Sequence, residues 1–449
     1  MDFTSKKIAI WGLGIVGKAA VRFFHKQNIA VDIMEKRELS SEEQRFLIDH
    51  KATFSKQTDV PTFLAAHDMC LASPGIDLRP YSAYHDRFVT ELDIFQQFWT
   101  KPIIAITGSV GKTTTTYLLS QLLSKSMRIA TGGNIGIGML DLLLEQNNYD
   151  CALLELSSFQ LEANSSFAPT LALWTNFYAN HLDRHMSAEE YFKAKAQIFL
   201  KQAGYAHAIV PLAEQKKIRS LAPERPFIWC STTPPADDQV EPCDSVYYLE
   251  NNHIMCKKEA VKRIICSVDL LPKLSFVENW LFIVAALDTL NIPVVPLLHK
   301  QSELHVPEHR LEKVAVINGA TFYNDSKSTI PMATMAALNN FEGKPIVLFI
   351  GGISKGVDRS PFVTLLAGKV KMLYCFGKEA RQLCDIARSV GINSFVHETL
   401  EDAVKHCMKQ IENGDIVLFS PAGASYDLFK NYEERGTRFK ALIKVHLKS

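Results

Sequence analysis

The stretch that decides the fold is Ile103 to Leu119, which reads IIAITGSVGKTTTTYLL. It opens with an apolar run typical of a buried strand, breaks at Thr107–Thr114, and continues with apolar residues at helical spacing. A strand, a glycine-rich turn, Lys-Thr and a helix are the parts of a phosphate-binding loop. The glycines let the backbone curl around an anion, and the new helix offers free N–H groups. This stretch therefore predicts a nucleoside triphosphate site in an α/β fold.

Individual residues of the loop have distinct predicted roles. Lys112 can reach the terminal phosphates, and the hydroxyl of Thr113 is placed for Mg²⁺. The spacing between the glycines is shorter than in the common form of the loop, which indicates a particular subfamily. We expect the triphosphate to be held by one continuous run, namely Gly108, Ser109, Val110, Gly111, Lys112, Thr113 and Thr114.

The length and composition of the chain fit a globular protein of several domains. Its 449 residues exceed what one ordinary core organises. A net charge of +1 without basic stripes argues against a nucleic-acid partner, and no apolar run is long enough for a membrane. The nine cysteines contain no Cys-x-x-Cys pair, and no signal-peptide core opens the chain. We therefore expect a cytoplasmic protein without a structural zinc site.

A second glycine-rich turn lies near the N-terminus. Lys7–Ala20 reads as strand, turn and helix, with GLGIVG at Gly12–Gly17, and Glu35 ends the next strand. This is the fingerprint of a dinucleotide-binding unit, which leaves NAD, FAD, another nucleotide or no ligand open. A further short strand, Met69–Ala72, ends at Ser73–Ile76, where α/β sheets bind ligands.

Polar residues follow the strands after the phosphate loop. An apolar strand carries Glu155 at its end, where a Mg²⁺ would need an anionic ligand. His181 lies in the loop after another buried strand, and Lys195 follows within a helical stretch. The glycine-rich run Ile129–Gly136, around Asn134, predicts a loop beside a ligand.

The last third of the chain reads as another α/β sheet with ligand loops at one edge. Four strands end in loops that carry Gly, Ser, Asp or Lys, among them Asn324–Thr329, Gly351–Gly356 and Ser420–Ser425. Lys327 and Lys355 in these loops suit carboxylates as well as phosphates. The pattern favours a substrate with free carboxylates.

Taken together, the motifs resemble those of the Mur ligases of peptidoglycan synthesis. The matching segments are TGSVGKTTTT, TGGNIG, LELSSFQL, NHLDRH with a following KAK, PEHRLE, NDSKST, GGISKG and SPAGASYDLFKNYEERG. The likeness extends from Gly12 to Arg438, essentially the whole chain. Asp325-Ser326-Lys327 and the Gly-Leu-Gly start point to the member that adds D-glutamate.

The resemblance implies an α/β protein of three domains. These would be a Rossmann-like UDP-substrate domain (1–92), a central P-loop ATP domain (93–296) and a Rossmann-like D-glutamate domain (297–449). The implied reaction joins D-glutamate to UDP-N-acetylmuramoyl-L-alanine at the expense of ATP, through an acyl phosphate. We expect a monomer that works in the cytoplasm.

The resemblance also implies the chemistry-bearing residues. Lys112, His181 and Lys195 would be catalytic. Two Mg²⁺ ions would be held by Thr113, Glu155, His181 and Lys195, the last as a carbamylated lysine.

The implied binding residues form three groups. Beside the phosphate loop, ATP would contact Asn279, Arg310 and Asp325. The UDP-sugar would contact Gly14, Ile15, Val16, Glu35, Ser73, Gly75, Asn134, Ser157 and Gln160. D-Glutamate would contact Lys327, Thr329, Lys355, Ser425 and Tyr432.

Three positions depart from the family pattern. Glu278 and Phe282 stand where the family often has His and a second Asn beside the adenine, and Tyr432 stands where Phe is common. Three other functions stay open: a sister ligase with another amino acid, an NAD-dependent oxidoreductase using Gly12–Gly17, and a nucleotide-binding switch. Asp325-Ser326-Lys327 argues against the first, and no hydride-transfer acid/base pair is evident for the second.

Overall fold

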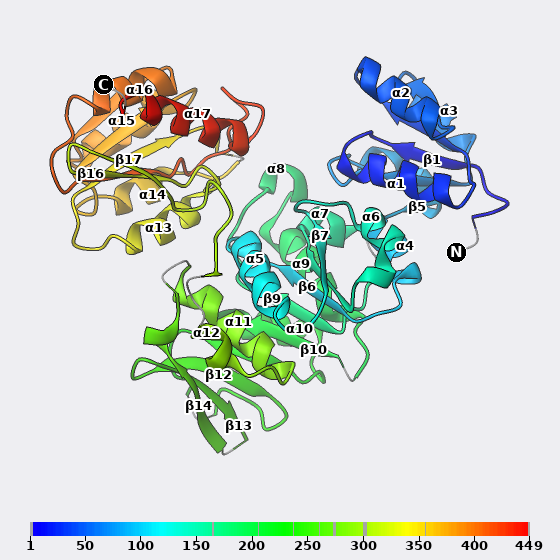
Figure 1. Cartoon of the computed structure of the whole chain (residues 1–449), viewed down its shortest axis with the longest axis horizontal. Helices are drawn as coiled ribbons and strands as arrows, with labels where there is room; N and C mark the ends of the chain where they lie inside the picture. The colour runs from blue at the N-terminus through cyan, green and yellow to red at the C-terminus, as the bar shows by residue number, and fades with distance from the viewer. Residues whose placement is uncertain are drawn as a thin grey trace.

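Three sheets that follow one another along the chain make up the structure (Figure 1). It is a computed structural model that describes residues 3–163, 166–204, 206–236, 238–259, 261–272, 275–299, 303–354 and 356–447, without the side chain of Asp183. The N-terminal sheet is blue, the central one cyan to green, and the C-terminal one yellow to red in the figure. Helices connect the parallel strands, so the predicted α/β class with three domains is confirmed.

The N-terminal sheet is parallel, with the order β3-β2-β1-β4-β5. Its strands are β1 (Ile8–Trp11), β2 (Val31–Glu35), β3 (Thr53–Lys56), β4 (Met69–Ala72) and β5 (Phe88–Val89). The helices of this region are α1 (Ile15–Lys26), α2 (Ser41–Asp49), α3 (Val60–Ala65) and α4 (Glu91–Phe98). A Cβ on Gly17 would lie 2.0 Å from the carbonyl oxygen of Gly12, so only glycine lets α1 pack this close to the turn.

The central sheet has the order β14-β13-β12-β11-β10-β9-β6-β8-β7. Its strands are β6 (Ile103–Thr107), β7 (Ile129–Gly133), β8 (Cys151–Glu155), β9 (Leu171–Trp174), β10 (His207–Pro211), β11 (Ile228–Ser231), β12 (Ser245–Glu250), β13 (His253–Lys258) and β14 (Val261–Ser267). The helices are α5 (Lys112–Leu123), α6 (Met139–Leu144), α7 (Ser158–Glu162), α8 (Leu182–His185), α9 (Ala188–Leu200), α10 (Gln215–Leu221), α11 (Val277–Thr289) and α12 (Val294–Leu298). Strands β7 to β12 are parallel, so the ends of β6, β8 and β9 meet at one edge.

Helix α11 anchors the central core next to the phosphate loop. It is apolar on nearly all sides, and every residue from Asn279 to Leu287 is buried. It packs beside α5, and both helices contribute to one apolar cluster. The buried helix therefore fixes Asn279 at the start of α5.

The C-terminal sheet has the order β15-β16-β20-β17-β18-β19. Its strands are β15 (Glu312–Ile317), β16 (Ala320–Asn324), β17 (Ile346–Gly351), β18 (Met372–Phe376), β19 (Ser394–His397) and β20 (Ile416–Phe419). The helices are α13 (Pro331–Asn339), α14 (Ser360–Leu365), α15 (Ala380–Ser389), α16 (Leu400–Cys407) and α17 (Tyr432–Val445). Only β15 and β16 pair antiparallel, through an Asn318-Gly319 turn in which both residues have positive φ.

One element differs from what the sequence predicts. The run Ile129–Gly136 is not a loop throughout, because Ile129–Gly133 pairs with β8 as strand β7. Helix α12 crosses the predicted boundary at 296/297 and packs on the central core through Val294 and Leu298. The limits of the three domains stay predictions. Within the described ranges, no helix combines the length and apolarity needed to span a membrane.

Candidate active site

The phosphate-binding loop leaves β6 and enters α5 through two glycines with positive φ. Gly108 has φ +156° and Gly111 has φ +81°. A Cβ on Gly108 would lie 2.1 Å from the hydroxyl oxygen of Thr175, and one on Gly111 would lie 2.3 Å from the side-chain oxygen of Asn279. Both positions therefore require glycine for their conformation and for space.

Asn176, at the end of β9, holds the first half of this loop. Its Oδ1 accepts the N–H groups of Ser109 (3.1 Å) and Val110 (2.9 Å), and its Nδ2 donates to the Val110 carbonyl (3.0 Å). These two N–H groups therefore do not point at an anion, although the sequence predicts that the whole loop from Gly108 to Thr114 holds the triphosphate. The anion-facing donors are those of the first turn of α5, which follows Gly111 and has no side-chain cap.

Two lysine amines meet at one backbone oxygen of the loop. Lys112 Nζ and Lys195 Nζ each donate to the carbonyl of Gly108 at 2.8 Å. Lys195 is 1% exposed, and burial together with the nearby Lys112 holds its pKa well below the ordinary value. Burial lowers the pKa of Lys112 as well. The carboxylate of Glu155 opposes both shifts, so the three groups form one electrostatic cluster.

Glu155, at the end of β8, brings a buried carboxylate to this cluster. It is 1% exposed, and its Oε1 accepts from Asn134 Nδ2 at 2.9 Å. Among the described residues its Oε2 has no hydrogen-bond partner. A buried carboxylate oxygen without a partner is costly, and a bound cation would satisfy it. The hydroxyl of Thr113, in the first turn of α5, is a second oxygen ligand of the kind that Mg²⁺ prefers.

His181 immediately precedes α8, on the side of the central domain that faces the other two domains (Figure 1). Its φ is +56°, and its N–H donates to the side chain of Asn180 at 2.9 Å. The imidazole lies edge-on to the ring of Phe159, with 5.1 Å between ring centres, and 6.1 Å from that of Tyr191. Left-handed backbone at a non-glycine residue costs free energy and is common at functional sites.

The C-terminal domain directs charged side chains at the same cluster. Lys327 Nζ lies 5.0 Å from the ring centre of Tyr432. Burial lowers the pKa of Lys327 to about 8, while Glu155 of the central domain acts in the opposite direction. Arg310 of the C-terminal domain likewise contributes to lowering the pKa of Lys112 in the central domain. Residues predicted from distant motifs are therefore brought within electrostatic reach of each other.

Asp325 is held deep in the C-terminal domain. Its Oδ2 accepts from the hydroxyls of Ser328 (2.5 Å) and Ser420 (2.7 Å), and Arg310 Nη1 lies 3.9 Å from its Oδ1. Burial raises the pKa of Asp325, and Arg310 opposes this rise. The arrangement orients the Arg310 guanidinium, whose Nε is buried and has no partner among the described residues.

A pocket of 380 Å³ lies between the central and C-terminal domains. Its walls combine Val110, Gly111, Thr114 and Asn279 with Arg310 from across the interface. Asn279 is oriented by a 2.8 Å hydrogen bond from its Nδ2 to the hydroxyl of Ser275. These predicted nucleotide contacts therefore share one cavity that opens onto the first turn of α5.

The N-terminal glycine turn borders a pocket of 560 Å³. Gly14, Glu35 and Ser73 line it. The Glu35 carboxylate accepts the backbone N–H groups of Leu13 (2.9 Å) and Lys36 (2.8 Å), so it fixes the shape of the turn. Ile15 and Val16 form the first two positions of α1.

The remaining predicted substrate contacts lie near the interfaces between domains. Ser157 and Gln160 are locked in a capping box at the start of α7, and Gln160 lines a 470 Å³ pocket between the N-terminal and central domains. Gly75 has an ordinary backbone conformation with space for a side chain, so its predicted role needs no glycine. Ser425 is buried and Thr329 is half-buried, whereas Lys355 lies outside the described residues.

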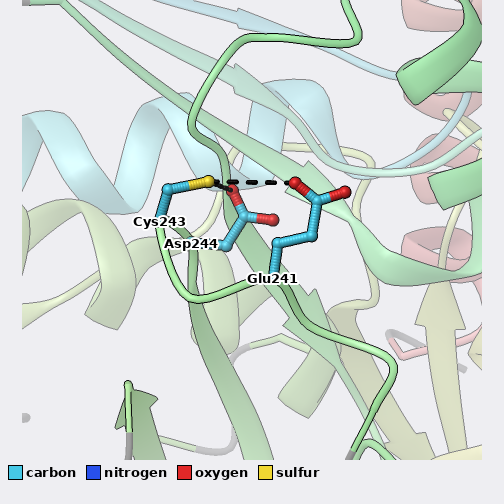
Figure 2. Close-up of side chains that lie close together, drawn as sticks. All are labelled: Glu241, Cys243 and Asp244. Carbon is cyan, nitrogen blue, oxygen red and sulfur yellow. Dashed lines mark hydrogen bonds between the residues drawn. The ribbon is translucent and has the colours of Figure 1, made fainter.

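One side-chain group elsewhere has the spacing of metal ligands. Glu241, Cys243 and Asp244 bring ligand atoms within 4.8 Å of one another (Figure 2). The carboxylate of Asp244 already accepts the Phe227 N–H and the Trp229 indole N–H, both at 2.7 Å, and pairs with Arg219. These bonds give Asp244 a structural role just before β12, at the amino-terminal ends of the parallel strands, whereas the phosphate loop lies at their carboxyl ends.

Comparisons with known proteins assign the whole architecture. Three family models match successive parts of the chain: the Mur ligase MurD-like N-terminal domain (residues 6–83), the Mur ligase middle domain (106–287) and the Mur ligase glutamate ligase domain (309–423). A curated relative from Caldicellulosiruptor bescii, named UDP-N-acetylmuramoylalanine–D-glutamate ligase, is 32% identical and covers 99% of this chain and 98% of its own length. Its namesake from Fervidobacterium nodosum is 31% identical, with coverages of 97% and 98%.

Solved structures agree with this fold. MurF from Thermotoga maritima, determined in complex with ADP, aligns with a TM-score of 0.61 at 14% identity and covers 94% of this chain and 95% of its own. MurC from the same organism aligns with a TM-score of 0.58 at 17% identity, with coverages of 98% and 99%. The chain belongs to the Mur ligase family.

The N-terminal match and the full-length relatives place it more narrowly: it is a MurD-like ligase. Its class is therefore that of the ATP-dependent amide ligases, and the oxidoreductase and the nucleotide switch are excluded as primary functions.

Proposed function

We propose that this MurD-like ligase joins the amine of D-glutamate to the alanyl carboxylate of UDP-N-acetylmuramoyl-L-alanine in the cytoplasm, as a monomer. The observation that carries the proposal is the Oε2 atom of Glu155, which has no hydrogen-bond partner among the described residues, together with the electrostatic influence of this carboxylate on Lys112 of the central domain and Lys327 of the C-terminal domain. Two carboxylate substrates and a triphosphate must meet in this reaction, so several positive groups are needed to stabilise the developing charge. The full-length relatives carry the name of this activity.

The chemistry divides into two displacements. A carboxylate oxygen of the alanyl group attacks the γ-phosphorus of ATP, the bond to the bridging oxygen breaks, and ADP leaves. The neutral amine of D-glutamate then attacks the acyl carbon, the carbon–oxygen bond to phosphate breaks, and the nitrogen loses a proton. Lys112 and the first turn of α5 would hold the γ-phosphate.

Two Mg²⁺ ions would complete this proposed site. Thr113 and Glu155 would hold one ion, and His181 with a carbamate on Lys195 would hold the other. Bound Mg²⁺ would neutralise phosphate charge and act as a Lewis acid at the acyl oxygen. The buried Lys195 amine, held 2.8 Å from the Gly108 carbonyl, would react in its neutral form with CO₂ and release one proton.

The pockets support a proposed position for each nucleotide. The uridine diphosphate would occupy the pocket at Gly14, Glu35 and Ser73, and the adenosine would occupy the one between Asn279 and Arg310. D-Glutamate would be received by the loops of the C-terminal domain that carry Lys327, Thr329, Lys355, Ser425 and Tyr432. The muramoyl group would then run past Asn134, Ser157 and Gln160 toward the phosphate loop.

Phosphate release tests the reaction and the acceptor together. The purified chain is given Mg-ATP and UDP-N-acetylmuramoyl-L-alanine, with D-glutamate, L-glutamate, a diamino acid or no acceptor. Release that depends on D-glutamate supports the proposal. Release with a different acceptor moves the chain to a sister ligase, and release indifferent to every acceptor overturns it.

A further inference from the structure

Arg184 joins the N-terminal domain to the catalytic side of the central domain. Its guanidinium Nη2 donates to the Ile76 carbonyl at 3.0 Å, and its Nη1 reaches the Gly75 carbonyl at 3.5 Å. Its Cζ lies 5.0 Å from the ring centre of Phe159 in α7. One side chain therefore contacts a loop of one domain and a helix of the other.

The loop that Arg184 contacts belongs to the predicted UDP site. Ser73 begins this loop, accepts the Ile76 N–H on its carbonyl at 3.0 Å, and donates its hydroxyl to the Gly12 carbonyl at 3.4 Å. The glycine turn, Ser73 and the two carbonyls thus form a continuous hydrogen-bonded path to Arg184. A movement of this loop would be passed on to the guanidinium.

The other end of the path is His181. The backbone N–H of Arg184 donates to the His181 carbonyl at 3.0 Å, which closes the single turn of α8. The ring of Phe159 lies beneath the guanidinium and also packs against the imidazole of His181. Arg184, Phe159 and Gln160 line the same 470 Å³ pocket, which Ser73 and Ile76 of the loop also line.

We propose that Arg184 is a positioning residue that fixes the UDP-binding loop relative to His181, so that the acyl group of the substrate reaches the phosphate-transfer site. This inference rests on the proposed function. The carbonyls of Gly75 and Ile76 supply its docking points, and Phe159 fixes the plane of the guanidinium. A lysine would keep the charge but lose the paired donors and the stacked plane.

Two other arginines provide matched controls. Arg22 also bridges the N-terminal and central domains, through Asp141 at 2.6 Å, but on the α1–α6 contact. Arg79 lines the same pocket as Arg184 and pairs with Asp77 of its own domain at 2.6 Å. Arg22→Gln reports a weaker domain contact, and Arg79→Gln reports a lost charge in the pocket.

The test measures acyl-phosphate formation without D-glutamate, trapped as a hydroxamate by hydroxylamine, and the KM values of both nucleotide substrates. A misplacement of about 1 Å in a reacting group costs about a hundredfold in rate, so Arg184→Gln should lower hydroxamate formation by about that factor. The KM for the UDP substrate should rise, while the KM for ATP should change less than about twofold. Arg184→Lys should recover part of the loss, and both controls should stay close to the parent.

Several results would overturn the inference. One is a fall in hydroxamate formation in Arg184→Gln that is no larger than in Arg22→Gln or Arg79→Gln. Another is a KM for ATP that rises together with the KM for the UDP substrate. If Arg184→Gln does not fold, Arg184→Lys decides, because full activity in that variant removes the need for paired donors. A parent chain that releases no phosphate in response to D-glutamate refutes the proposed function instead.

Discussion

Removing the side chain of Asn176 should weaken the use of ATP, because this side chain holds the backbone of the phosphate loop. In Asn176→Ala, the Val110 N–H loses its 2.9 Å acceptor, and the Val110 carbonyl loses a 3.0 Å donor. Ser109 keeps a partner, because its N–H also donates to the Asn176 backbone carbonyl at 3.2 Å. Two hydrogen bonds at about 1 kcal/mol each give about 2 kcal/mol, which corresponds to about a thirtyfold fall in kcat/KM for ATP.

The assay is D-glutamate-dependent phosphate release as a function of ATP concentration. Asn340→Ala is the matched control, since Asn340 lines the same 380 Å³ pocket as Asn176 but its Nδ2 donates to the helix carbonyls of Ala336 and Ala337. It should change kcat/KM for ATP by less than about twofold. Retention of nearly full kcat/KM in Asn176→Ala would refute the idea that this side chain shapes the loop.

Three further predictions use the same assay or thermal unfolding. Lys112→Ala should abolish turnover. Lys195→Ala should also abolish turnover, with partial recovery when small carboxylates such as acetate are added. Full activity in Lys195→Ala would rule out a functional carbamate on Lys195. Because burial lowers the pKa of Lys327 to about 8, its ammonium form disappears as the pH rises through that value, so the KM for D-glutamate should climb above about pH 8. Lys327→Arg should flatten this rise. An unchanged pH profile in that variant would contradict a role of Lys327 in binding D-glutamate. Burial raises the pKa of Glu91 from 4.5 to about 7, so the folded state binds its proton more tightly than the unfolded chain and loses stability as the pH rises from about 4.5 to 7. The loss amounts to about 3 kcal/mol, and Glu91→Gln should reduce it; identical pH dependence of the melting temperature in both proteins would show that Glu91 is not its source.

Much of the sheet architecture follows from local sequence. The strands β6, β8 and β17 are apolar except for Thr107 and Glu155 at the ends of β6 and β8, as expected for parallel strands covered on both faces. Strand β3 could not be found in this way, because all four of its residues, Thr53–Lys56, are exposed at a sheet edge. Its pairing depends on the neighbouring β2 rather than on its own pattern.

The residues of the candidate site also differ in how far the sequence alone predicts them. Lys112 and Glu155 could be proposed from the sequence because phosphate and Mg²⁺ chemistry favours those residue types near the ends of β6 and β8, whereas Lys195, in the middle of α9, was proposed only through the family resemblance. Asn176 and Arg184 were missed, because their roles depend on partners 66 and 108 residues away in the chain. For Asn176, its place directly after a buried strand next to β6 was the available signal. No local pattern distinguishes Arg184 from a surface arginine.

The carbonyl of Gly108 has a consequence for the timing of events in the site. It accepts from both Lys112 and Lys195, which lie on different helices, α5 and α9. A carbonyl oxygen has two lone pairs, so these amines use its full capacity. Any anion that draws Lys112 outward leaves this oxygen to Lys195 alone. Binding of a phosphate at α5 would therefore change the hydrogen bonding of the Lys195 amine on α9 through this single peptide group.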